Sequence, residues 1–309
     1  MPARPWTWRR GGELLTTGDS RLTSHDSLLT LSPMKIDSHQ HFWKFDPVRD
    51  SWITSEMTVI RKDFLPEDLQ PVLAQNGFDG SVLVQTDQSE SHNDFLIGLA
   101  SRHPFIKGIV GWVDLQSENI RERLHFYRRY KLIKGFRHIL QGEKDRALML
   151  KPGFMRGIEA LKEFDYTYDI LIFPDQLQYA KELVAAFPEQ KFVIDHIAKP
   201  RIKEKKIEDW KKGMIDIAQY KNVYCKISGM VTEGDWMKWK KRDFSPYLDT
   251  VTVAFGINRI MYGSDWPVCL VAATYEEMME IVKDYFTSFS IEEQQKVFGK
   301  NAIEFYNLK

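Results

Sequence analysis

The sequence has few cysteines and no excess of charge of either sign. Its two cysteines, Cys225 and Cys269, form neither a CxxC pair nor a disulfide framework, so we expect buried free thiols in a reducing cytoplasm. Lysine and arginine together number 43, and so do aspartate and glutamate. This balance lacks the basic excess that nucleic-acid binding needs, so nucleic acid is not expected as a partner.

Long apolar runs are also missing. Because no run has the length of a signal peptide or a membrane span, the sequence supports neither secretion nor a membrane partner. Residues 1–33 mix arginine, glycine, serine, threonine and leucine without a clear period, and we expect them to be a disordered extension. The folded domain is then expected to be residues 34–309.

The remaining sequence alternates short β-branched or apolar runs with segments of helical period, which is typical of βαβ units and a parallel sheet. Because eight right-handed units of this kind close a sheet on itself, the sequence predicts an α/β protein with a single (β/α)8 TIM barrel. An open, doubly wound sheet has the same pattern and is the alternative. The eight expected strands are residues 35–40, 80–86, 106–113, 132–140, 167–173, 191–197, 222–228 and 259–264.

Two histidines end the first expected strand, in the segment IDSHQH. Residues two apart in a strand point to the same face, so His39 and His41 are expected to project together. Two such imidazoles can bind one metal ion or one substrate oxygen. The alternative is an incidental pair of polar residues at a strand end.

The sixth and eighth strands lead into the segments DHIAKP and YGSDWPV. Barrel enzymes place catalytic groups at the carboxyl ends of strands, which makes His196 and Asp265 candidates and lets Lys199 reach a substrate oxygen. Asp195 is expected to face the opposite side. Taken singly, His196 is as compatible with a structural histidine and Asp265 with a turn cap, but three such segments meeting at one barrel mouth are more specific.

Further candidates for substrate contact lie at or near other strand ends. Arg137 could hold substrate oxygens, Gln85 could meet a hydroxyl, and Trp43 and Trp112 could offer flat apolar faces to a sugar ring. The alternatives are a strand-end ion pair for Arg137 and core packing for the tryptophans. The long segment 42–67 is expected to overlie the site, either as a lid or as a cover held by buried tryptophans.

The segments HQHFW, DHIAKP, YGSDWPV and the ending FGKNAIEFY resemble the amidohydrolase superfamily, whose fold is the metal-dependent-hydrolase type of (β/α)8 barrel. Within it, the resemblance is to the amidohydrolase-2 branch of sugar-lactone hydrolases, such as L-fuconolactonase and L-rhamnonolactonase, and it runs from Met34 to the end. By this resemblance His39 and His41 match the first-strand HxH, His196 the sixth-strand histidine and Asp265 the eighth-strand aspartate.

The sequence also departs from the superfamily pattern. Residues 169–174 offer no fifth-strand histidine, and no lysine stands at the end of the fourth strand, so a two-metal site is not expected. The resemblance implies a single divalent metal ion, zinc before others, on His39, His41 and Asp265, and no organic cofactor. The lactonase branch that the sequence resembles also looks able to work without a metal, so this alternative stays open.

The resemblance implies a hydrolase that opens a small-molecule sugar lactone, such as L-fucono- or L-rhamnono-lactone. Asp265 would be the general base, and the metal or the histidines His39, His41 and His196 would stabilise the oxyanion. One alternative is a metal-dependent decarboxylase of an aromatic acid, a branch whose fifth-strand histidine is missing here. The other is a barrel that binds a ligand without catalysis. The sequence leaves the oligomeric state open.

Overall fold

The computed structural model describes residues 33–309, so the expectation for residues 1–33 lies outside the described part except at Pro33. Eight parallel strands form one sheet in chain order, each pairing with the next. The strands are β1 (Ile36–Gln40), β2 (Gly80–Val84), β3 (Ile106–Gly111), β4 (Ile133–His138), β5 (Thr167–Ile170), β6 (Phe192–Ile194), β7 (Val223–Ile227) and β8 (Ile260–Tyr262).

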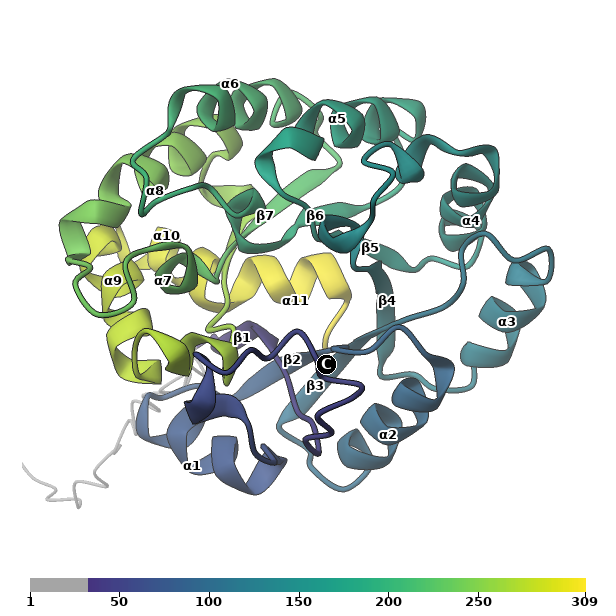
Figure 1. The fold of residues 1–309 in the computed structure, drawn as a ribbon, viewed down its shortest axis with the longest axis horizontal. Coiled ribbons are helices and arrows are strands. Elements are labelled where there is room, and N and C mark those ends of the chain that lie inside the picture. Colours follow the sequence, from purple (N-terminus) through teal and green to yellow (C-terminus); the bar gives the residue numbers. More distant parts are fainter. Residues whose placement is uncertain (1–32) are drawn as a thin grey trace, which may run out of the picture. The chain divides into compact units, whose positions relative to one another are not determined.

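The sheet curls until its first and last strands meet (Figure 1). The amide of Asp265 donates to the carbonyl of His39 at 2.8 Å, and the amide of His41 donates to the carbonyl of Trp266 at 2.7 Å. These bonds lie just beyond the end of β8, where Gln40 forms a parallel bridge with Trp266. The predicted (β/α)8 barrel is therefore confirmed, and the open doubly wound sheet is wrong.

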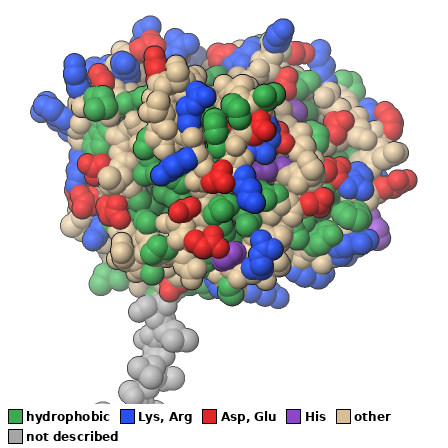
Figure 2. Space-filling view, turned by 60° about the horizontal axis from the view of Figure 1, so that its bottom comes forward, with side chains coloured by type: hydrophobic (Ala, Val, Ile, Leu, Met, Phe, Trp, Pro, Cys, Tyr) green, Lys and Arg blue, Asp and Glu red, His purple; other side chains and the backbone are tan. Residues whose placement is uncertain are grey.

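Helices surround the strands as the outer layer of the barrel (Figure 1). Within residues 33–309, no helix is long and apolar enough to cross a membrane. On the face drawn in Figure 2, basic and acidic side chains are intermixed. The helices are α1 (Pro66–Gln75), α2 (Glu90–Ala100), α3 (Ile120–Tyr127), α4 (Pro152–Glu163), α5 (Leu177–Ala186), α6 (Glu208–Ile217), α7 (Met230–Glu233), α8 (Lys241–Phe255), α9 (Tyr275–Phe286), α10 (Ile291–Gln295) and α11 (Asn301–Tyr306).

Several strands end earlier than the sequence predicted. The sixth was expected to reach residue 197, but β6 stops at Ile194 because the backbone turns to positive φ at His196. The fifth was expected to reach residue 173, but β5 stops at Ile170. Their last residues leave the sheet and become loops at the barrel mouth, where functional side chains of this fold lie.

The helix α11 closes the opposite, amino-terminal end of the barrel (Figure 1). It packs Ala302, Phe305 and Tyr306 against the residues that fill the barrel interior. The floor of the barrel is thus a closed apolar layer, and the candidate functional side chains lie at the opposite end, the mouth. The interior residues of this layer, all fully buried, are Ile36, Val82, Val84, Val110, Val193 and Met261.

Because Phe305 fills this floor, its truncation should leave a cavity. We expect Phe305→Ala to lower the free energy of unfolding by about 3–5 kcal/mol. Val253→Ala removes an exposed side chain of α8 and should change it by no more than about 0.5 kcal/mol. Urea denaturation of both variants checks this, and equal effects would show that α11 does not seal the barrel.

Candidate active site

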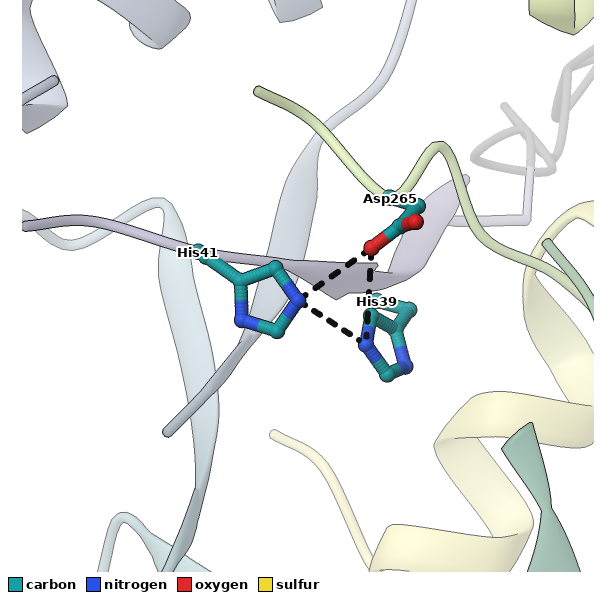
Figure 3. Close-up of side chains that lie close together, drawn as sticks. All are labelled: His39, His41 and Asp265. Atoms are coloured by element: carbon teal, nitrogen blue, oxygen red, sulfur yellow. Dashed lines mark hydrogen bonds and ion pairs between the residues drawn. The ribbon is translucent and has the colours of Figure 1, made fainter. Parts of the chain in front are cut away.

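Two histidines and an aspartate meet at the seam between β1 and β8 (Figure 3). The Nε2 atoms of His39 and His41 lie 3.1 Å apart. Oδ1 of Asp265 lies 3.2 Å from Nε2 of His41 and 3.9 Å from Nε2 of His39. All three side chains are buried, and their nearest atoms are close enough to contact one small ligand together.

The contact between His41 and Asp265 lacks a hydrogen when the imidazole is neutral. Nδ1 of His41 lies 2.7 Å from the carbonyl oxygen of Val84, which can only accept, so Nδ1 carries the hydrogen. The lone pair of Nε2 then faces a carboxylate oxygen. A divalent cation would satisfy both acceptors, since zinc binds imidazole nitrogen and carboxylate oxygen at about 2.0–2.2 Å. The donor set therefore fits one metal ion on His39, His41 and Asp265.

His196 reaches the same place from an unusual turn after β6. The four residues His196, Ile197, Ala198 and Lys199 all have φ between +47° and +57°, the left-handed region that non-glycine residues rarely adopt. This conformation costs about 1–2 kcal/mol per residue. It places Nε2 of His196 3.9 Å from Oδ1 of Asp265. The imidazole thus joins the cluster only because the surrounding structure holds a strained backbone.

Burial sets the charges of these groups. It lowers the pKa of His196 well below its ordinary value, although Asp265 opposes this effect, and it does the same for His39 against the opposing effect of Asp195. Burial alone would raise the pKa of Asp265, but His196 and Lys199 oppose this effect and the pKa is lowered. At neutral pH these two imidazoles are therefore uncharged and the carboxylate is ionised, as metal binding or water activation requires.

Asp195 does not face away from the site, so that prediction is wrong. Because β6 has already ended, the strand alternation that the prediction used no longer holds at this residue. One carboxylate oxygen of Asp195 lies 3.3 Å from Nδ1 of His39, and the other accepts from Arg137 at 2.9 Å. The Arg137 guanidinium, fixed also by the carbonyl of Gln85, approaches Nε2 of His39 to 3.3 Å. The predicted ion pair at the end of the fourth strand exists, and it lies beside the candidate metal ligands.

A buried lysine beneath the histidines was missed by sequence reasoning. Nζ of Lys226 lies 3.1 Å from Nδ1 of His39, 3.1 Å from Asp195 and 2.5 Å from Asp169. Tyr306 of α11 donates to the same oxygen of Asp169 at 2.7 Å. The sequence did hold a signal for it, a lone lysine within the otherwise apolar strand VYCKI. A lysine in such a strand is expected to be buried, and a fully buried lysine is almost always paired with a carboxylate.

A cavity of about 300 Å³ opens above the cluster. Arg137, Lys199, His41, His196 and Asp265 line it, which brings together five of the predicted site residues. Lys199 is tied at 3.1 Å to Glu233 of α7. The other lining residues are Trp52, Met57, Thr86, Ile139, Gln141, Leu171, Thr232, Glu233, Trp236 and Val268.

Three predicted substrate contacts are not among the lining residues. Trp43 is packed in the core and donates its indole hydrogen to the carbonyl of Lys62, and Trp112 donates to His138. The side chain of Gln85 is buried and donates to the carbonyl of Arg137. Two other tryptophans, Trp52 and Trp236, line the cavity instead. Trp52 comes from the long segment after β1, which thus takes part in the site.

The comparisons with known proteins agree with the observed fold. A family model described as amidohydrolase matches residues 36–308. The chain belongs to the amidohydrolase family. The resemblance read from its motifs is confirmed, and so is the prediction that the protein is a hydrolase enzyme.

Relatives within this family share the whole length of the barrel. An L-fucono-1,5-lactonase of Burkholderia multivorans is 36% identical over 289 residues, which cover 90% of this chain and 97% of the relative. An L-fucono-1,5-lactonase of Burkholderia ambifaria is 33% identical, with 89% and 96% covered. A crystal structure of an amidohydrolase from Burkholderia multivorans with bound zinc matches with a TM-score of 0.87 at 36% identity, covering 89% of this chain and 100% of that one.

The buried lysine gives a stability prediction. Replacing Lys226 by methionine would leave two buried carboxylates without their ammonium, so we expect Lys226→Met to lower the free energy of unfolding by about 3–5 kcal/mol. Lys241 also bridges two carboxylates, Glu280 and Asp284, but on the surface. Lys241→Met should therefore cost no more than about 1 kcal/mol. Chemical denaturation compares them, and similar costs would contradict a dominant effect of burial.

Proposed function

We propose that the protein hydrolyses a sugar-derived lactone by attack of water on the ring carbonyl, with Asp265 as the general base. The observation that carries the proposal is the cluster of His39, His41 and Asp265, of which His41 and Asp265 line the cavity. It is supported by 36% identity over 289 residues to an L-fucono-1,5-lactonase. L-fucono-1,5-lactone is therefore the first substrate to test, and L-rhamnono-lactone the second.

The base has to be ionised and within reach of the water. Asp265 satisfies both conditions, because its lowered pKa keeps it charged at neutral pH and its side chain lines the cavity. Its carboxylate would take a proton from the attacking water. The same proton would then pass to the ring oxygen as the carbon–oxygen bond breaks, so that one residue serves in turn as base and acid.

The oxyanion needs donors that are already in place. His196 can supply one, because Nδ1 lies 2.9 Å from the Ser228 hydroxyl, and when that hydroxyl donates, Nε2 carries the hydrogen toward the cavity. Arg137 supplies a fixed positive charge at the base of the cavity, held by Asp195 and Gln85. Such preorganised donors are each worth about 10²–10³-fold in kcat for acyl-transfer enzymes.

The cavity walls suit a small sugar ring. Trp52, Trp236 and Leu171 give apolar surface, while Lys199 and Gln141 can meet hydroxyl groups. Aromatic faces pack against the C–H face of a ring, and polar side chains at the edge select the hydroxyl pattern. The volume of about 300 Å³ matches a single ring better than an oligosaccharide.

We further propose zinc as the metal that this site takes. His39, His41 and Asp265 would hold it, and the zinc in the related amidohydrolase structure supports this choice. A bound zinc ion lowers the pKa of a water ligand to about 7 and polarises a carbonyl. Asp265 has two carboxylate oxygens, so one can face the metal while the other accepts a proton.

The assigned base gives the first functional prediction. We expect Asp265→Asn to lower kcat on L-fucono-1,5-lactone by about 10²–10⁴-fold, the usual contribution of a positioned acid or base. Asp249→Asn changes an exposed carboxylate of α8 and should leave kcat unchanged. A proton-release assay over a panel of aldonolactones measures both. Full activity of Asp265→Asn, or turnover of aromatic acids alone with release of carbon dioxide, would overturn the proposal.

The three candidate metal ligands give the second functional prediction. After treatment with a chelator, the protein should bind about one zinc ion per chain, since the three ligands form a single site. Losing a residue that only hydrogen-bonds a metal ligand already lowers metal affinity by about 10–100-fold. His41→Ala removes a ligand itself, so it should weaken zinc binding by more than this. His125→Ala, on the exposed face of α3, is the control. Competition with a chromophoric chelator measures affinity, and equal affinities of the two variants would reject the site.

A further inference from the structure

The left-handed turn after β6, residues 196–199, has little to hold it from within. One main-chain hydrogen bond joins two of its four residues, from the amide of Lys199 to the carbonyl of His196 at 2.8 Å. Four successive non-glycine residues with positive φ would relax to a more ordinary conformation unless outside contacts prevented it. The contacts that hold this turn therefore decide where its side chains lie.

A tryptophan of the outer layer supplies the clearest of these contacts. The indole Nε1 of Trp210, on α6, donates to the carbonyl of Ile197 at 2.7 Å. Trp210 is buried, packs against Tyr247 of α8 with ring centroids 5.1 Å apart, and is not among the residues that line the cavity. Trp210 therefore holds the middle of the turn from the side that faces away from the cavity.

The two ends of the turn carry the side chains that enter the site. His196 and Lys199 line the cavity, whereas Ile197 and Ala198 between them are fully buried. On the other side, Gly229 leaves room for the imidazole, because a Cβ there would lie 2.6 Å from Nδ1 of His196. A shift of the Ile197 carbonyl would therefore move His196 relative to Asp265.

We propose that Trp210 is a positioning residue for the reaction: through its bond to the Ile197 carbonyl it holds the left-handed turn that presents His196 to the substrate. Trp210 does not line the cavity, and its indole donates to Ile197, which is not a candidate metal ligand. The inference rests on the proposed lactone hydrolysis, because it assigns Trp210 a role in that reaction through His196.

The test removes the indole hydrogen and keeps an aromatic ring. We expect Trp210→Phe to lower kcat by about 10–100-fold, the size of effect that follows a misplacement of a catalytic group by about 1 Å. Trp239→Phe is the matched control, because the indole of Trp239 also donates to a main-chain carbonyl, that of Ala272, at 2.7 Å. Its kcat should stay close to that of the unchanged protein. Circular dichroism confirms that both variants are folded at the assay temperature.

A double-mutant cycle separates an effect of Trp210 on the position of His196 from a general loosening of the fold. If Trp210 acts through His196, then Trp210→Phe should cost much less in a His196→Ala background than in the unchanged protein. Equal losses in both backgrounds, or an unchanged kcat of Trp210→Phe, would overturn the proposal.

A second variant relieves the backbone strain of the turn at Ala198. It keeps the proposal testable if Trp210→Phe alone does not fold. Glycine adopts positive φ without steric cost, so adding Ala198→Gly to Trp210→Phe should restore part of the lost activity. No recovery in the double variant would count against the proposal.

Amide hydrogen exchange of the peptide that covers residues 195–200 reports on the turn without any substrate. It should speed up in Trp210→Phe and not in Trp239→Phe, and equal exchange would overturn the proposal. A wild-type protein that opens no lactone would instead defeat the proposed function, and the exchange comparison would still test the turn.

Discussion

Two main-chain hydrogen bonds join the end of β1 to the segment after β8, and the candidate site depends on them. Each bond begins or ends on a residue that carries chemistry: Asp265 donates to His39, and His41 donates to Trp266. Closing the barrel therefore sets the distance between the carboxylate and both imidazoles. Residues more than 220 positions apart in the chain become neighbours because the sheet has no free edge there.

Between this seam and the apolar floor, the barrel interior carries a layer of paired charges. Asp195 lies between the cations of Arg137 and Lys226, and Lys226 is shared with Asp169. Two positive and two negative groups balance one another, as buried charges must if the fold is to tolerate them. Because His39 contacts both Lys226 and Asp195, the same network fixes the orientation of a candidate metal ligand.

The sequence predicted those parts of the molecule that follow a regular period. His41 lies one residue beyond β1, but the chain stays paired there through the bridge of Gln40 with Trp266, so the spacing of two residues still placed His39 and His41 together. The same rule failed at Asp195, since β6 had ended and no local pattern announced four left-handed residues. The lining tryptophans, Trp52 and Trp236, come from loops, whose course depends on tertiary packing that periodicity does not describe.

We infer that His39, His41 and Asp265 act together on one ligand. X-ray absorption spectroscopy at the zinc edge, on protein loaded with one equivalent of zinc, tests it most directly. We predict a first shell of nitrogen and oxygen donors at about 2.0–2.2 Å, with the outer-shell scattering of two imidazoles. A shell without imidazole scattering, or one that is unchanged in a variant lacking both histidines, would contradict it.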